Sequence, residues 1–331
     1  MSLLEIKGLK IVFASGGKPI RAVENIDLRI EEGESVALVG ESGCGKSVTG
    51  FSVMRLLKSP PATVRADKIL FDAGEGHPFD ILNAGEKAMQ ALRGDRIGMI
   101  FQEPSSALNP VMSVGRQIDE VFMRHRGVKQ KDAAPMTIDI MRGVGISAPE
   151  RRYKQFPHEM SGGMKQRILI AMAVACRPRL LIADEPTTAL DVTIQAQILA
   201  LLHELIDRNR TAMLLITHDL GVVASSASRV YVMYCGKIVE HGATTDVLNK
   251  PLHPYTKGLL RAVPRLSEKK ERYEPIPLSV PHPAQKPEGC YFHPRCPEVC
   301  EACRRYMPPL IKTADGREVR CWKVQWYNIT C

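Results

Sequence analysis

The sequence has no long hydrophobic run. Although 44% of its 331 residues are hydrophobic, no apolar stretch approaches the roughly 18–20 residues that a membrane-spanning helix needs. The first residues, MSLLEIKGLKIVF, place Glu5, Lys7 and Lys10 where an export signal requires an unbroken apolar segment. We therefore expect a cytosolic protein that does not itself cross a membrane.

Aromatic residues are also scarce, at 5% of the chain. They do not alternate with basic residues, as they would in a binder of single-stranded nucleic acid. The net charge of +9 is concentrated after residue 250, where 14 Lys and Arg stand against 8 Asp and Glu. Such a basic segment could contact nucleic acid or anionic lipid, but a solvated surface is the commoner outcome.

The composition changes near Lys250. The residues that follow it contain 12 of the 23 prolines, which marks a domain boundary. We predict one domain at residues 1–250 and an appended proline-rich, cysteine-rich region at residues 251–331 with little regular helix.

Cysteines are few in the body of the chain but cluster near its end. Five of the nine lie close together: Cys290, Cys296, Cys300, Cys303 and Cys321. In a small secreted protein such a cluster would form disulfides, whereas in the cytosol it indicates a metal or iron–sulfur site. The expected compartment therefore favours a metal.

The strongest motif lies in ESVALVGESGCGKSVTGFSVMRLL. This stretch predicts a buried strand at Ser35–Val39, then a glycine-rich turn, then a helix that ends at residues 59–61. The turn fits G-x-x-x-x-G-K-[ST] at all four defined positions, which are Gly40, Gly45, Lys46 and Ser47. An ordinary glycine-rich turn is the alternative, and the complete match in a strand–loop–helix setting disfavours it.

The chemistry of this turn follows from its residue types. Glycines let successive backbone N–H groups converge on phosphate oxygens, and a helix N-terminus adds the positive end of its dipole. Lys46 can then reach the β- and γ-phosphates, and the Ser47 hydroxyl can ligate Mg²⁺. We expect Cys44, inside the turn, to contribute only its backbone.

A second motif, RLLIADEPTTALD, predicts a buried strand at residues 180–183 that ends in two acids. Buried parallel strands deliver their C-terminal residues to the ligand crevice. Asp184 is therefore placed to hold the Mg²⁺ shell and Glu185 to polarise a water. A helix N-cap is the alternative for these acids, and the neighbouring phosphate motif outweighs it.

A third strand is predicted at Met213–Ile216, with His218 just beyond its end. A lone histidine is usually structural, but one at this position can hydrogen-bond a γ-phosphate. Between the second and third strands, apolar residues recur at helical spacing from Ile194 to Ile206. This pattern predicts an amphipathic helix that packs on the sheet and carries no chemistry.

The stretch FPHEMSGGMKQRILIAMAVACRPRLLIADEPTTALD links these motifs. Its Ser-Gly-Gly turn, at a helix start shortly before an acidic strand, is typical of the ATP-binding cassette (ABC) ATPases, which residues 4–250 resemble. The resemblance implies an α/β P-loop fold: a RecA-like core with a mainly parallel sheet, an antiparallel β subdomain, and a helical signature subdomain at about residues 104–172.

The resemblance also implies a role for each matching residue. Phe13 stacks on adenine, and the phosphate-loop residues bind ATP: Gly40, Ser42, Gly43, Cys44, Gly45, Lys46, Ser47 and Val48. Glu185 is the catalytic base, aided by His218 and Gln102. The Mg²⁺ ligands are Ser47, Gln102 and Asp184.

The remaining matches concern a cassette dimer. Ser161, Gly162 and Gly163 form the signature turn that contacts the ATP held by the partner, and Asp191 lies in the loop that crosses the dimer interface. Met164 stands where many members have glutamine, but the serine and glycines that face phosphate are intact. The resemblance implies that each ATP lies between the phosphate loop of one chain and the signature turn of the other.

Within the family, the chain resembles the D-type ATP-binding subunit of oligopeptide, dipeptide and nickel importers. Three features carry this resemblance: the signature MSGGMKQR, the exit from the cassette NKPLHPYTKGLLRAVP, and the cysteine-bearing region after it. The implied activity is ATP hydrolysis that powers peptide import, with nickel or another small solute as the alternative. The implied partners are a second cassette subunit in a heterodimer, two membrane permeases and an extracytoplasmic binding protein, with this chain on the cytoplasmic face of the inner membrane.

Some cassette ATPases act on nucleic acid instead. Those in repair and chromosome structure carry long insertions, and those in translation usually hold two cassettes. This chain has one cassette with a short spacing from Gln102 to Ser161, so we expect no nucleic-acid partner.

The cysteines at 290, 296, 303 and 321 have the spacing C-x₅-C-x₆-C-x₁₇-C. This spacing matches neither common zinc sites nor ferredoxins, although four thiolates can hold Zn²⁺ or an iron–sulfur cluster. The resembling importer subunits have cysteines at this spacing and are associated with a [4Fe–4S] cluster, which the resemblance therefore implies for Cys290, Cys296, Cys303 and Cys321. Zn²⁺ is the alternative, because Cys300 and Cys303 form a C-x₂-C pair.

Overall fold

The computed structural model describes residues 2–14, 17, 19–188, 190–262 and 276–325. The chain divides into two compact units. Unit 1 is formed by Met1–Leu4, Ile30–Glu34 and Leu70–Leu215, and unit 2 by Glu5–Arg29, Ser35–Ile69 and Ile216–Cys331. In these described residues, no helix is both long enough and apolar enough to span a membrane.

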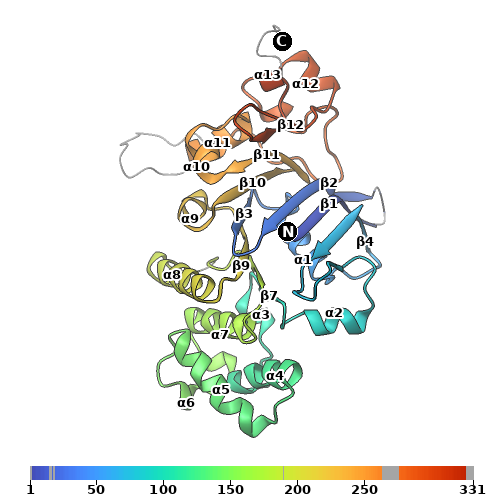
Figure 1. Ribbon diagram of the computed structural model, residues 1–331. Coiled ribbons are helices and arrows are strands. Elements are labelled where there is room, and N and C mark those ends of the chain that lie inside the picture. The colour runs from blue at the N-terminus through green and yellow to red at the C-terminus, as the bar shows by residue number, and fades with distance from the viewer. Residues whose placement is uncertain (1, 15–16, 18, 189, 263–275, 326–331) are drawn as a thin grey trace. The chain divides into compact units, whose positions relative to one another are not determined.

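Unit 1 combines strands with a group of helices (Figure 1). Its elements, in chain order, are β6 (Phe79–Asp80), α2 (Glu86–Leu92), β7 (Ile97–Ile100), α3 (Pro104–Ala107), α4 (Val114–Arg126), α5 (Gln130–Gly143), α6 (Pro149–Arg152), the 3-10 helix η1 (Pro157–Glu159), α7 (Gly162–Val174), β8 (Leu180–Asp184), α8 (Val192–Asn209) and most of β9 (Ala212–Thr217). Strands β7 and β8 are parallel, with Ile97 opposite Leu180.

Unit 2 contains the remaining elements. They are most of β1 (Ser2–Phe13) and β2 (Ile20–Glu31) and the first half of β5 (Lys68–Phe71), together with β3 (Ser35–Val39), α1 (Lys46–Val53), β4 (Ala62–Arg65), α9 (Leu220–Ser226), β10 (Arg229–Tyr234), β11 (Lys237–Ala243), α10 (Thr244–Asn249), α11 (Pro254–Ala262), η2 (His293–Arg295), α12 (Glu301–Arg305), β12 (Ile311–Lys312), β13 (Glu318–Val319) and α13 (Trp322–Gln325). Strands β3 and β10 are parallel, whereas β4 pairs antiparallel with β1 and β11 with β10.

The three strands that the sequence predicts around the nucleotide motifs are all present. Strand β3 has the predicted bounds, and β8 and β9 each extend beyond the predicted core by one or two residues. Every residue of β8 and β9 is buried. A strand that is covered on both faces buries every side chain, so its sequence is a continuous apolar run and not an alternation of apolar and polar residues.

The helix after the phosphate loop is shorter than predicted. It ends at Val53 instead of continuing to residues 59–61. Arg55, two residues later, has a φ of 48°, in the left-handed region that ends a right-handed helix. The prediction relied on the prolines as the stop signal and therefore missed this earlier turn.

The prediction of a separate cysteine-rich extension is not supported. The described residues beyond 251 belong to unit 2, and β13 continues its sheet by pairing antiparallel with β11. Tyr255 and Phe292 are buried beside Tyr234 of β10, with ring centroids 4.6 Å and 5.3 Å from that of Tyr234. This aromatic cluster buries the segment in the core of the unit that holds the phosphate loop.

A buried polar network joins the helices of unit 1. The Asp119 carboxylate of α4 accepts a hydrogen bond from the Thr137 hydroxyl of α5 at 2.6 Å. It also accepts one from the Tyr153 hydroxyl, which directly follows α6. Burial and the neighbouring Asp119 carboxylate raise the pKa of Tyr153 to about 12, so the phenol keeps its proton and remains a donor.

We expect Asp119→Ala to lower the free energy of unfolding by about 3 kcal/mol, because two hydroxyls lose their acceptor. Urea denaturation would measure this loss. Asp139→Ala is the control, since Asp139 pairs with Arg142 on the exposed surface of α5, and such a pair contributes under about 1 kcal/mol. Equal losses in the two variants would contradict a special role for the buried network.

Candidate functional site

The phosphate loop, Gly40 to Ser47, joins β3 to α1 in unit 2. Gly40 has a φ of 155° and Gly45 a φ of 109°. A side chain on Gly40 would collide with the carbonyl oxygen of Met233, and a Cβ on Gly45 would lie 2.7 Å from that of Ala22. Only glycine fits between the loop and these two backbones.

Lys46 is almost fully buried, at 5% exposure. Its ammonium donates to the carbonyl oxygens of Gly40 at 2.8 Å and Glu41 at 3.1 Å. The loop therefore curls around its own lysine. Ser42 and Gly43 are exposed at its outer side, and Ser47 and Val48 begin α1 half-buried.

Cys44 is buried, with 1% of its surface exposed. Burial raises the pKa of its thiol, although the Lys46 ammonium opposes the shift. The protonated thiol is a weak nucleophile at neutral pH. This environment suits the predicted role, in which Cys44 contributes its backbone.

The acidic motif stands at the end of β8 in unit 1. Asp184 is buried, and Glu185 has a left-handed backbone with a φ of 46°. The Glu185 carboxylate accepts hydrogen bonds from the Gln102 amide at 3.1 Å and the Thr188 hydroxyl at 2.8 Å. The structure thus joins the predicted base to the predicted loop glutamine, and it adds Thr188.

Thr188 was not among the residues predicted for the site. Its sequence signal is its place three residues after Glu185, in the turn that returns the hydroxyl to the carboxylate. The Gln102 amide and the Thr188 hydroxyl orient the Glu185 carboxylate, as a group that must accept a proton requires.

The signature turn also lies in unit 1, at the start of α7. The Ser161 hydroxyl caps this helix by accepting from the Met164 N–H at 3.4 Å. A Cβ on Gly163 would lie 2.9 Å from the Ile194 side chain of α8, which explains the need for glycine there. Ser161 and Gly162 remain exposed, as a turn that contacts a second molecule requires.

The other predicted residues lie at element ends. Asp191 caps α8, its carboxylate accepting from the Ile194 N–H at 2.9 Å. His218, in unit 2, is exposed between β9 and α9. Phe13 is half-buried at the end of β1, where it pairs with Ala62 of β4.

The described side chains give no support to the metal site predicted at Cys290, Cys296, Cys303 and Cys321. Among the described residues, no three His, Cys, Asp or Glu side chains are grouped to hold one metal ion. The Cys300 and Cys303 sulfurs are 3.5 Å apart. Burial raises the pKa of Cys290 to about 11 and of Cys296 to about 12.

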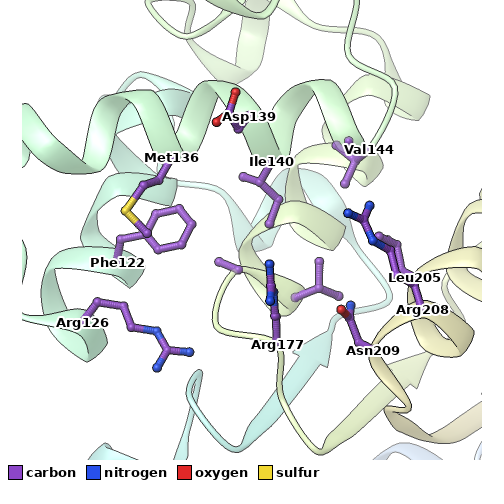
Figure 2. Close-up of a pocket in the computed structure, with 13 residues that line it drawn as sticks. Phe122, Arg126, Met136, Asp139, Ile140, Val144, Arg177, Leu205, Arg208 and Asn209 are labelled. Atoms are coloured by element: carbon purple, nitrogen blue, oxygen red, sulfur yellow. The ribbon is translucent and has the colours of Figure 1, made fainter.

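A cavity of about 520 Å³ lies within unit 1, and none of the residues that line it is a predicted site residue. Phe122 of α4 and Ile140 of α5 line one side, and Leu205 and Arg208 of α8 line another (Figure 2). Its lining contains neither the loop glutamine nor the acids of β8, so this cavity is not the ATP site.

These features define a P-loop nucleotide-binding protein, and comparison with known proteins identifies the family. Residues 23–188 match the ABC transporter model, and residues 239–303 match the model of the oligopeptide/dipeptide transporter C-terminal region. The chain belongs to the ABC transporter family, as an ATP-hydrolysing ATP-binding subunit.

Relatives match along nearly the whole chain. A putative peptide import ATP-binding protein of Brucella ovis is 47% identical over 99% of this chain and 98% of its own. The oligopeptide transport ATP-binding protein AppD of Bacillus subtilis is 46% identical over 97% of this chain and 96% of its own. The dipeptide transport ATP-binding protein DppD of Escherichia coli is 45% identical, also over 97% of this chain and 96% of its own.

Solved structures confirm the cassette fold. The cassette MJ0796, in a dimeric post-hydrolysis state bound to ADP and Pi, has a TM-score of 0.64 at 25% identity, covering 73% of this chain and 98% of its own. CbiO1 of Clostridium perfringens, part of the cbiONQ transporter complex, has a TM-score of 0.61 at 25% identity, covering 75% and 91%.

Proposed function

We propose that this protein hydrolyses ATP to power the import of dipeptides or oligopeptides. The observation that carries this proposal is similarity over nearly the full length to peptide-transport ATP-binding proteins, including the C-terminal region at residues 239–303. We assign the cassette to residues 1–250 and the region typical of the peptide importers to residues 251–331.

Within the site, we propose that Glu185 is the catalytic base and that Gln102 positions it. Their hydrogen bond and the buried end of β8 support this assignment. His218 contacts the γ-phosphate, and Phe13 contacts adenine. Mg²⁺, held by Ser47, Gln102 and Asp184, would neutralise phosphate charge.

We propose that two cassettes sandwich each ATP. The exposed Ser161 and Gly162 at the N-terminus of α7 suit contact with the γ-phosphate bound by the partner. Asp191 crosses the interface beside them. Closure on ATP and reopening after hydrolysis would then follow from different affinities for ATP in the two states.

The membrane partners are two permeases, fed by an extracytoplasmic binding protein. A groove in unit 1, lined by residues that include Val111, Arg116 and Phe156, suits a permease segment that lies on the cytoplasmic side. Val111 is 83% exposed, which is high for a valine and leaves apolar surface for a partner.

The catalytic assignment predicts that Glu185→Gln nearly abolishes ATP turnover while MgATP binding stays within about threefold. The amide keeps the shape and the hydrogen bonds but cannot accept a proton. Phosphate release and nucleotide titration would measure the two effects. Retained hydrolysis would refute Glu185 as the base.

The transport assignment predicts that the tagged chain co-purifies with permease subunits from detergent-solubilised membranes. Val111→Asp should reduce that recovery at least fivefold, since a carboxylate would lie in an apolar contact. Leu278→Asp is the control, at another highly exposed apolar position, in unit 2. Recovery without permeases, with ATPase activity stimulated by nucleic acid, would overturn the importer function.

The [4Fe–4S] cluster, or Zn²⁺ in its place, remains a separate hypothesis. The pKa of Cys303 responds to Cys300 and Cys296, and that of Cys290 to Cys303 and Cys321, so these thiols are near neighbours. Anaerobic purification followed by metal analysis would test it. The cluster requires about four iron and four sulfide per chain, and a colourless protein with one zinc would exclude it.

A further inference from the structure

The segment that carries the cysteines touches the phosphate loop directly. Arg295, at the end of η2, forms a two-pronged ion pair with Glu41, the residue after Gly40. Its Nη1 lies 2.7 Å from Glu41 Oε2, and its Nη2 lies 2.9 Å from Oε1. A planar guanidinium bonded in this way fixes the direction of a carboxylate as well as its charge.

Arg295 is itself held firmly. Only 4% of it is exposed, and its Nε donates to the Pro277 carbonyl oxygen at 2.9 Å. Its guanidinium also lies over the ring of Tyr234, 5.8 Å from the centroid. The guanidinium therefore has one orientation available, and the Glu41 side chain must follow it.

The backbone of Glu41 has a second anchor. Its N–H donates to the hydroxyl of Tyr255, a fully buried residue at the start of α11, at 2.9 Å. The start of α11 is held in turn by Glu240, whose carboxylate accepts the N–H groups of Leu252 and His253. Tyr255 is thus placed by β11, and Glu41 by Tyr255.

A third set of bonds supports the other side of the loop. Lys286 donates to the carbonyl oxygens of Arg21 at 2.6 Å and Cys235 at 2.7 Å, and to the Glu24 carboxylate at 2.7 Å. Next to Cys235, the Gly236 N–H donates to the Cys44 carbonyl oxygen of the phosphate loop. The segment therefore supports the phosphate loop at two places: at Glu41, and at the Cys235–Gly236 backbone that bonds Cys44.

We propose that Arg295 is a positioning residue for nucleotide binding, acting through Glu41 on Lys46. The Lys46 ammonium bonds the carbonyl oxygens of Gly40 and Glu41, so the orientation of the Glu41 peptide sets where the lysine sits. Arg295 and Tyr255 together fix that peptide by its side chain and its N–H. The region after residue 251 is then part of the ATP site's support.

This inference rests on the proposed function, in which Lys46 binds the phosphates of ATP. Without the ion pair the Glu41 peptide can rotate, and the loop must be ordered again each time nucleotide binds. That ordering cost weakens binding. The expected consequence is a higher dissociation constant for MgATP.

The test is calorimetric titration of the full chain with MgATP, alongside thermal unfolding. Arg295→Met should weaken MgATP binding about tenfold. Arg295→Lys keeps the positive charge but not the two-pronged guanidinium geometry, so it should restore only part of the lost affinity. Arg305→Met is the matched control in the same segment, because its ion pair with Glu301 is exposed. It should leave both binding and stability unchanged.

The double variant Arg295→Met with Glu41→Gln separates positioning from folding. It removes the buried charge of Arg295 together with the half-buried charge of Glu41, so the melting temperature should return towards that of the unaltered chain while MgATP binding stays weak. Binding by Arg295→Met within twofold of the unaltered chain would overturn the inference. So would recovery of binding together with stability in the double variant. Failure of the unaltered chain to bind MgATP would instead refute the proposed function.

Discussion

A loop can present its backbone N–H groups to phosphate only if its own ends cannot move. In this protein the constraint acts at the phosphate loop, where Gly40 and Gly45 lie against neighbouring backbones that leave no room for a Cβ. Strand β3 holds one end through its parallel pairing with β10, and α1 begins directly at the other. The contacts of Glu41 with Tyr255 and Arg295 complete this support.

The acidic end of β8 depends on a similar combination of a rigid strand and an unusual turn. Burial of the whole strand fixes the position of Asp184, and the left-handed backbone of Glu185 turns the next carboxylate away from the strand direction. Such conformations persist where surrounding contacts enforce them, and they are common at functional sites. Gln102 and Thr188 supply those contacts by binding the same carboxylate oxygen.

The elements that could be predicted were those whose signal is local. Strands β3, β8 and β9 are short apolar runs, and α8 shows helical spacing over several turns, so residue type alone indicated each one. The end of α1 could not be predicted in this way, because the left-handed residue that follows it is Arg55 and not the glycine that usually marks such a position. The predicted separation of the cysteine-rich region was unsupported for another reason. Phe292 is buried against Tyr234, which lies much earlier in the chain, and such a long-range contact leaves no local pattern in the sequence.

The sequence by itself determined the chemical class of this protein. A phosphate-binding loop, an acidic strand end and a signature turn each need a few residue types at short spacing, and all of these can be recognised without coordinates. Only the tertiary structure decided which distant residues support them. The bond between Arg295 and Glu41 joins positions 254 residues apart, and no periodicity or motif encodes such a pair, since it arises only when the folded strands bring the two segments into contact.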